Sequence, residues 1–179
     1  MDSQAIARGN ESFVRAGTYR GLAMMPRQRV MIVGCADPRV DPEQILGLQL
    51  GDAAVIRNIG GRVTPPTLAT IAGLARLGAH AAQTAAGPGN PPGLDLLVVH
   101  HTDCGILRLL DEPGALAGFL GTDLEGLDAM AVADPYRAVV HDVSVLRGLA
   151  MPGLRVWGLV YDVATGAVEI TASPEAAAA

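Results

Sequence analysis

Cysteine and aromatic residues are both scarce in this sequence. Only two cysteines, Cys35 and Cys104, occur among 179 residues, and aromatic side chains make up 3% of the total. In a cytosolic protein a structural disulfide between two such cysteines is not expected, which leaves metal ligation or redox chemistry as the roles to test. The low aromatic content means that the core has to be built from small and aliphatic side chains.

Long apolar runs and clusters of basic residues are missing as well. No apolar stretch approaches the roughly 20 residues that cross a bilayer, and residues 1–13 lack the basic start and apolar middle of a signal peptide. The net charge is -5, and the scattered basic residues form no stripe that could follow a phosphate backbone. The sequence therefore predicts a soluble, cytoplasmic protein that binds neither membranes nor nucleic acid.

Segments with strand-like and helix-like patterns alternate along the chain. With 179 residues, half of them apolar, the chain has the size of one domain, 1–179. The pattern predicts strands at 29–34, 53–56, 94–101, 154–162 and 167–172, and helices at 11–22, 45–50, 67–80, 105–110 and 135–149. We expect an exposed loop at 81–93, and loop with short helix at 111–134. The predicted fold class is α/β, with a mainly parallel central β-sheet flanked by helices.

Both cysteines lie at the carboxyl ends of predicted strands, and His101 lies three residues before Cys104. In open α/β sheets, functional sites gather at that end of the strands. If the strands are neighbours, Cys35, His101 and Cys104 supply two thiolates and one imidazole, a set that zinc accepts at tetrahedral angles with bonds of about 2.0 to 2.3 Å.

Three protein ligands would leave one zinc position open. Structural zinc sites normally have four protein ligands and no third cysteine exists here, so a catalytic site is the better interpretation, with a water or a nearby carboxylate in the fourth position. Asp37 and Arg39 follow Cys35 on the same turn, and the guanidinium favours the ionised form of the carboxyl group. Asp37 could then accept a proton or a hydrogen bond from the water.

Three segments together resemble the β-class carbonic anhydrases. They are Cys-Ala-Asp-Pro-Arg at 35–39, Gly-Asp-Ala-Ala-Val-Ile-Arg-Asn-Ile-Gly-Gly at 51–61 and His-His-Thr-Asp-Cys-Gly at 100–105, and the later Val-Trp-Gly-Leu-Val-Tyr-Asp-Val-Ala-Thr-Gly at 156–166 follows in the family's order. Each short motif is weak evidence alone, but their combination at this separation is specific.

The resemblance implies roles for individual residues. It implies that one zinc ion per chain is bound by Cys35, His101 and Cys104. It also implies that Asp37 and Arg39 are the catalytic pair, and that the Gly105 backbone N–H contacts the substrate. It also implies a homodimer, or a larger assembly of dimers, with active sites near the subunit interface. A helical arm at 1–27 would pack on the partner subunit.

Two features depart from the family pattern. No aromatic residue lies between Tyr19 and Phe119, where the plant-type branch has pocket Phe and Tyr residues, so the sequence is closer to the archaeal-type branch. The loop predicted at 81–93 is also longer than the family's usual connection.

The predicted activity is zinc-dependent, reversible hydration of carbon dioxide to bicarbonate and a proton. A hydrolase of carbonyl sulfide or carbon disulfide would use the same zinc chemistry, and only a substrate assay separates the two. A zinc-containing binding or regulatory protein would need neither Asp37 nor Arg39. A thiol redox protein would favour a Cys-x-x-Cys pair rather than two distant cysteines.

Several polar residues and glycines near these motifs have more than one interpretation. His100 is either a structural neighbour of the site or a proton relay. Asp103 either orients its turn or bonds a nearby arginine, which we favour over contact with the zinc. Arg57 and Asn58 either pair with an acidic residue or cap a helix. The glycines at 60–61 either allow close approach of backbones or only form a turn.

Overall fold

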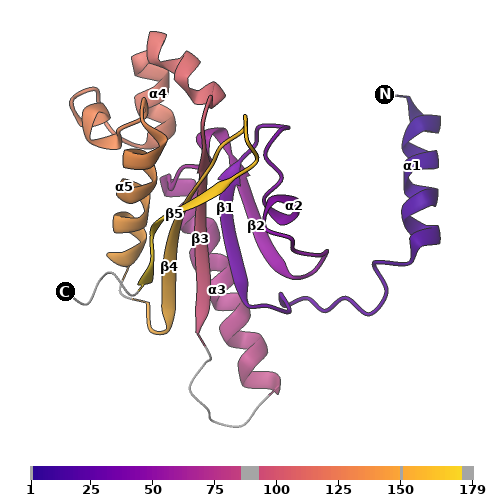
Figure 1. Ribbon diagram of the computed structural model, residues 1–179. Helices are drawn as coiled ribbons and strands as arrows, with labels where there is room; N and C mark the ends of the chain where they lie inside the picture. The colour runs from indigo at the N-terminus through magenta and orange to yellow at the C-terminus, as the bar shows by residue number, and fades with distance from the viewer. Residues whose placement is uncertain (1, 86–92, 150, 175–179) are drawn as a thin grey trace.

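A five-stranded sheet forms the centre of the protein in the computed structural model, which describes residues 2–85, 93–149 and 151–174. The strands run in the order β2-β1-β3-β4-β5, with bounds β1 Val30–Cys35, β2 Ala53–Asn58, β3 Leu94–His101, β4 Leu154–Tyr161 and β5 Val168–Ala172. The first four are parallel, and β5 forms an antiparallel hairpin with β4 (Figure 1). The predicted α/β fold with a mainly parallel sheet is confirmed.

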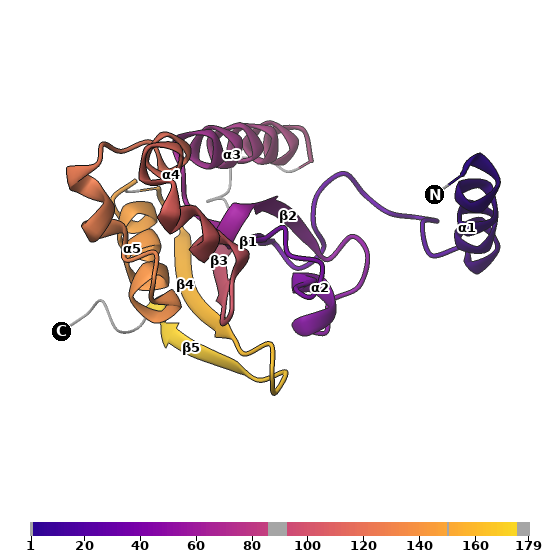
Figure 2. The ribbon, with the colours of Figure 1, turned by 90° about the horizontal axis from the view of Figure 1, so that it is seen from above.

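Helices α3 and α5 cover one face of the sheet, and the short α2 lies on the other side (Figure 2). Their bounds are α2 Pro42–Ile45, α3 Pro65–Ala85 and α5 Pro135–Arg147. Between β3 and α5 the chain forms α4 Pro113–Leu120 and two 3-10 helices, η2 Gly105–Asp111 and η3 Glu125–Met130, while a third, η1 Ile59–Gly61, follows β2. No helix among the described residues is long and apolar enough to cross a membrane.

The two faces of the sheet differ in how well they are covered. Side chains such as Val33 and Val98 pack with Ile71 of α3 and Val139 of α5 in the main core. Because side chains alternate along a strand, Ile32 and Val99 face the opposite side, where the helical cover is only partial. In this arrangement the carboxyl ends of the neighbouring strands β1 and β3 lie side by side at the same end of the sheet.

The bounds of two predicted helices between β1 and β3 are wrong. Residues 46–50 are not helical, because α2 begins at Pro42, capped by Asp41, and the chain turns at Gly47 with a φ of 68°. The helix expected at 67–80 continues to Ala85, so the first part of the expected 81–93 loop is helical, and 86–92 lie outside the described residues. The segment 111–134, expected to hold loop and short helix, contains α4 and η3, as predicted.

The N-terminal helix α1 spans Ser3–Ala16 rather than the predicted 11–22. The Asp2 carboxylate caps its start by accepting a hydrogen bond from the Ala5 N–H at 2.7 Å, and Gly17, with a φ of 69°, ends it. None of its residues is buried, and the helix stands apart from the sheet (Figures 1 and 2).

Candidate metal centre

Cys35, His101 and Cys104 meet at the carboxyl end of the sheet. Cys35 is the last residue of β1, His101 is the last of β3, and Cys104 precedes η2. Because β1 and β3 are parallel neighbours, their ends bring these side chains together, and the ligand atoms all lie within 4.8 Å of one another. The convergence predicted from the sequence is therefore present.

The imidazole of His101 is oriented for metal binding. Its Nδ1 lies 2.9 Å from the Thr102 carbonyl oxygen, an arrangement in which Nδ1 carries the proton and donates it. Its Nε2 is buried and has no hydrogen-bond partner among the described residues, so a lone pair is available there. A backbone acceptor that fixes the tautomer of a histidine is typical of metal ligands.

The two sulfur atoms also suit a divalent cation. They lie 3.8 Å apart, with Cys35 buried and Cys104 partly exposed. The hydrogen bond with the Cys104 thiol lowers the pKa of Cys35 although burial opposes this, whereas the Cys35 thiolate and burial raise the pKa of Cys104. The pair therefore retains one proton, and a cation in its place would neutralise both thiolates, so this donor set fits zinc.

Asp37 and Arg39 form an ion pair beside the cluster. Arg39 donates to Asp37 Oδ1 from its backbone N–H at 2.9 Å and from Nε at 3.0 Å, and to Oδ2 from Nη2 at 2.8 Å. These hydrogen bonds hold the pKa of the Asp37 carboxyl well below its usual range, despite burial. The Asp37 N–H also points at Cys35 Sγ, 3.4 Å away, which ties the pair to the metal ligands.

Asp103 connects the two halves of the site. Its carboxylate accepts a hydrogen bond from Arg39 Nη1 at 2.7 Å, and its carbonyl oxygen accepts one from Nη2 at 2.8 Å. The backbone of Asp103 has a φ of 51°, in the left-handed region that Asp and Asn tolerate better than most residues. Of its two interpretations, the bond to a nearby arginine is confirmed.

Arg57 holds the loop that carries Cys35 and Asp37. Its guanidinium donates to three backbone carbonyls, those of Cys35 at 2.9 Å, Asp37 at 2.8 Å and Val40 at 2.6 Å. Neither an acidic partner nor a helix cap was the right interpretation. The sequence offers no signal for this role, because backbone acceptors are present in every loop.

Asn58, Gly60 and Gly61 shape the segment packed against Cys35. The Asn58 side chain accepts from the Arg62 N–H at 2.8 Å and donates to the Arg62 carbonyl oxygen, so it closes the turn locally. A Cβ on Gly61, whose φ is 65°, would lie 3.0 Å from the Cys35 nitrogen and 2.9 Å from the Val99 carbonyl oxygen. The close backbone approach is confirmed at Gly61, whereas a Cβ on Gly60 would meet the side chains of Ile106 and Arg62.

A buried polar network next to the cluster was missed by the sequence reasoning. Arg62 and His100 both bond the carboxylate of Asp142 on α5, and all three side chains are almost fully buried. The signal in the sequence is the position of Asp142 within α5, because it shares the apolar face of that helix with Val139, Val143 and Leu146. A carboxylate at a core position of a helix requires a partner.

Comparisons with known proteins agree with this geometry. The model of the carbonic anhydrase family matches residues 30–131. The β-carbonic anhydrase 1 of Mycobacterium tuberculosis is 32% identical over 159 residues, which cover 84% of this chain and 87% of that protein. A carbon disulfide hydrolase of Acidianus is 36% identical over 85 residues, which cover 48% of this chain and 35% of that protein.

The fold of a solved carbonic anhydrase is also similar. The crystal structure of the Streptococcus mutans enzyme superimposes with a TM-score of 0.66 at 26% identity, covering 96% of this chain and 99% of the other. The region 30–131, which the family model matches, includes all three cluster residues and the ion pair that follows Cys35. By sequence and by structure, this chain belongs to the β-carbonic anhydrase family.

Proposed function

We propose that this carbonic anhydrase hydrates carbon dioxide reversibly to bicarbonate and a proton at the Cys35, His101 and Cys104 cluster, which holds one zinc ion. The observation that carries the proposal is the convergence of two thiols and one imidazole within 4.8 Å, beside an arginine-bound carboxylate. A non-catalytic zinc site would require no such carboxylate.

Asp37 and Arg39 are proposed as the catalytic pair. Zinc, when bound, supplies a Lewis acid that lowers the pKa of a water molecule. Asp37 Oδ1 receives two N–H groups from Arg39 but Oδ2 receives only one, so Oδ2 keeps a lone pair for a further hydrogen bond. Since Arg39 keeps the carboxyl ionised, Asp37 acts as an acceptor that orients a donor, and Arg39 fixes the direction of that acceptor.

Gly105 is proposed as the substrate contact. It directly follows Cys104 and is exposed, and a Cβ at this position would meet nothing within 4 Å. A backbone N–H in such an open position beside the cluster could donate a hydrogen bond to a substrate oxygen as negative charge develops on it.

The test is carbon dioxide hydration, measured by stopped flow on protein whose zinc has been quantified. We expect one zinc per chain in the unmodified protein, loss of zinc in Cys104→Ala, and retained zinc with little activity in Asp37→Asn. Carbon disulfide, assayed in parallel, checks the alternative substrate class. Protein that contains no stoichiometric zinc would overturn the proposal.

The archaeal-type branch remains our proposal for the position of this chain within the family. It is supported by the absence of aromatic residues between Tyr19 and Phe119. The large apolar side chains that line the cavity next to the cluster are aliphatic: Ile106, Leu107 and Val132. A cytoplasmic location is proposed because the two cysteines are free thiols, which persist in a reducing compartment.

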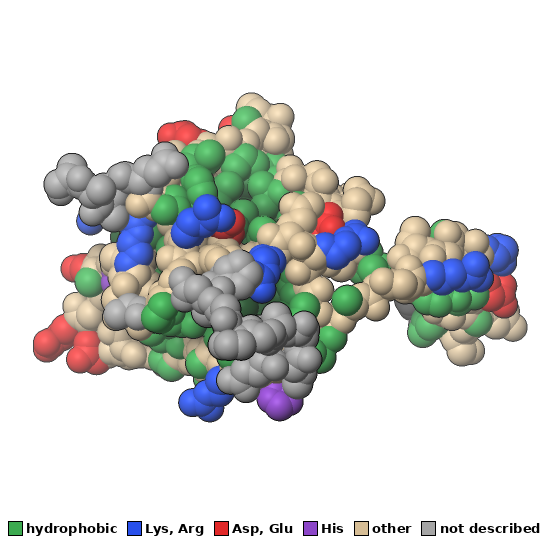
Figure 3. Space-filling model, turned by 90° about the horizontal axis from the view of Figure 1, so that it is seen from below, with side chains coloured by type: hydrophobic (Ala, Val, Ile, Leu, Met, Phe, Trp, Pro, Cys, Tyr) green, Lys and Arg blue, Asp and Glu red, His purple; other side chains and the backbone are tan. Residues whose placement is uncertain are grey.

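We also propose that the chain is one domain, 1–179, that forms a homodimer or a dimer-based assembly in which the arm 1–27 packs on the partner. Ile6 and Phe13, seven residues apart on one side of α1, are 58% and 42% exposed. Figure 3 shows α1 apart from the body, with basic side chains on part of its surface and hydrophobic ones beside them. A helix with an exposed apolar side requires a surface to cover it.

The partly covered face of the sheet offers such a surface. A groove of about 350 Å³ lies there, lined by Leu46, Leu48, Leu97, Trp157 and Ile170 among others. Figure 3 shows hydrophobic side chains gathered on this side of the body. We propose that α1 of a second copy occupies it, which would bury the apolar side of α1 and the groove together.

A further inference from the structure

A buried ionic network lies directly behind the metal ligands. Arg62 donates to the two oxygens of Asp142, from Nε at 2.8 Å and from Nη2 at 3.2 Å. His100 Nε2 lies 3.1 Å from Asp142 Oδ2, and each of the three side chains is at most 3% exposed. The network therefore joins the segment after β2, the end of β3 and α5.

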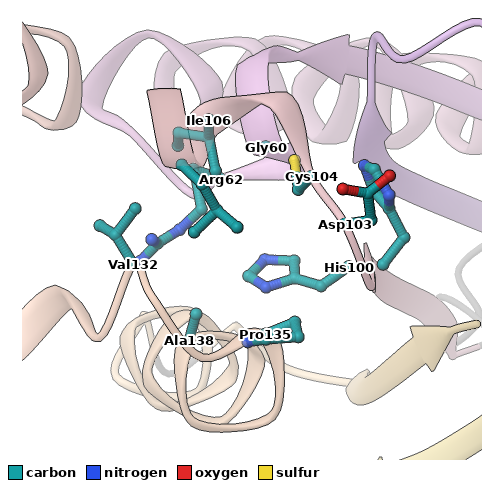
Figure 4. Close-up of a pocket in the computed structure, with 11 residues that line it drawn as sticks. Gly60, Arg62, His100, Asp103, Cys104, Ile106, Val132, Pro135 and Ala138 are labelled. Carbon is teal, nitrogen blue, oxygen red and sulfur yellow. The ribbon is translucent and has the colours of Figure 1, made fainter. Parts of the chain in front are cut away.

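The network adjoins the residues that would bind zinc. Arg62 and His100 line a cavity of about 30 Å³ together with His101 and Cys104. Figure 4 shows the His100 ring between Cys104 on one side and Ala138 of α5 on the other. Because successive side chains of a strand face opposite sides, His100 faces α5 while His101 faces the cluster.

Stability alone does not account for these buried charges. Taking an ion pair out of water costs free energy that the pair often fails to recover, and apolar replacements of such pairs are frequently neutral or stabilising. Here the cost is increased because Arg62 Nη1 is buried without a hydrogen-bond partner in the described part of the chain. A gain other than folding stability is therefore expected from the network.

A benefit other than folding stability can arise at the end of β3, which carries the metal ligand His101. The pairing of β3 with β1 stops at Gly34 and Val99, whereas its pairing with β4 continues to His101 and Tyr161. Backbone pairing within the sheet therefore restrains His100 and His101 on one side only. The bond from His100 to Asp142 adds a second anchor, through a helix, one residue before a metal ligand.

We propose that Arg62, Asp142 and His100 form a positioning network that fixes the 101–104 turn, and so sets the geometry and affinity of the metal site without touching substrate. This inference rests on the proposed zinc site. It assigns a role to three residues whose separation in sequence hides their contact. It also explains why a carboxylate occupies the apolar face of α5.

The test replaces the anchor and measures the metal site directly. In His100→Leu the bond to Asp142 is lost, while Arg62 and the Val63 N–H still satisfy the carboxylate, so the fold is expected to survive. We expect zinc affinity, measured by chelator competition, to fall at least about tenfold, as for other residues that support metal ligands. The absorption spectrum of the cobalt-substituted protein should also change, since it reports ligand geometry.

Two variants act as matched controls. His100→Gln keeps an N–H donor at similar reach and should restore both zinc affinity and the cobalt spectrum. His141→Leu makes the same replacement on α5 outside the network and should change neither. Wild-type affinity and spectrum in His100→Leu would overturn the proposal.

A double variant covers the case in which His100→Leu does not fold. Arg62→Met with Asp142→Leu removes both charges, so no buried charge is left unpaired, and the same two measurements then decide the proposal. Unmodified protein that binds neither zinc nor cobalt would instead overturn the proposed metal site, which separates failure of that site from failure of the network.

Discussion

Arg39 links the two turns that carry the metal ligands and their polar neighbours. It bonds Asp37 on its own turn and Asp103 on the turn that carries Cys104, so it spans the two segments that supply the metal ligands. Its side chain is 47% exposed, and ion pairs at that exposure contribute little to folding stability. We therefore expect Arg39 to set the orientation of the Asp37 carboxylate rather than to stabilise the fold.

Replacing Arg39 should separate metal binding from turnover. In Arg39→Ala the Asp37 carboxylate loses its restraint and can move to the open position of the metal, and we expect retained zinc with activity reduced about 100-fold or more. Zinc content and stopped-flow hydration measure the two effects. Arg137→Ala, on the exposed side of α5, is the control, and full activity in Arg39→Ala would contradict the role proposed for the pair.

Gly61 is constrained by both its conformation and its surroundings. Its φ is 65°, and backbone atoms of Gly34, Cys35 and Val99 lie within 3.0 Å of the position that a Cβ would take, so there is no room for a side chain. We expect Gly61→Ala to lower the free energy of unfolding by about 2 kcal/mol or more, from left-handed strain and steric overlap. Urea unfolding measures this.

Gly73→Ala provides the matched control for that experiment. Gly73 lies inside α3, and a Cβ there meets nothing within 4 Å. Because alanine favours helix, this variant should be stabilised by up to about 1 kcal/mol. Equal effects at Gly61 and Gly73 would show that backbone approach at the cluster is not as close as the structure describes.

Strand ends and local motifs predicted the cluster, but contacts that depend on how a helix packs could not be predicted. Cys35, His101 and Cys104 were found because each lies at a strand end, and parallel neighbours place their ends together. The His100 and Asp142 side chains, 42 residues apart, meet only because α5 packs on that face of β3. No pattern within either segment specifies that packing.

At the scale of elements, the sheet was easier to predict than the helices. Strand β1 is a short continuous apolar run, and β3 has the apolar run 96–99 at its centre, a pattern typical of buried parallel strands. The wrong helix at 46–50 had apolar residues at helical spacing, but they pack on the second face of the sheet from a turn around Gly47. The helix α1 has no core partner in the part of the chain that the structure describes, so its bounds depend on Asp2 and Gly17 alone.

Asp52 joins the segment before β1 to the start of β2. Its carboxylate accepts hydrogen bonds from the Gln49 N–H at 2.8 Å, from Arg27 Nε at 2.9 Å and from Gln28 Nε2 at 3.0 Å. The Gln49 bond and then that of Arg27 lower the pKa of Asp52, although burial opposes them. This carboxylate thereby fixes the segment that leads from the arm into the sheet.

The stability that Asp52 contributes should depend on pH in a defined direction. A carboxyl whose pKa is lowered on folding stabilises the protein above its unfolded pKa, about 3.9, and loses that effect as pH falls through the folded value. Asp52→Asn should therefore be less stable than the unmodified protein at pH 7 and pH 5, with the difference shrinking below about pH 4. Urea unfolding at pH 7, 5 and 3.5 measures it, and a difference that grows on acidification would contradict the assignment.

At the scale of the whole molecule, α1 and the groove are two apolar surfaces that residues 2–85, 93–149 and 151–174 of the single chain leave uncovered. The groove is lined by Leu46 and Leu48 after α2 and by Trp157 on β4, and α1 stands apart from the sheet and does not cover it (Figure 2). Apolar surfaces of this kind on separate parts of one chain are typical of proteins that associate through an exchanged arm.

The association predicted from these surfaces can be tested with one charge on either side of α1. Phe13→Glu places a carboxylate on the side that carries Ile6, and its burial against the groove of a partner would be unfavourable, so we expect a shift toward monomer in light scattering across a concentration series. Gln4→Glu adds the same charge on the opposite side of α1 and should leave the mass unchanged.

Trp157 lines the groove, so its fluorescence should shift toward that of an exposed indole only in Phe13→Glu. An unchanged mass and an unchanged spectrum in both variants would mean that α1 does not cover the groove, and that the arm has another partner surface.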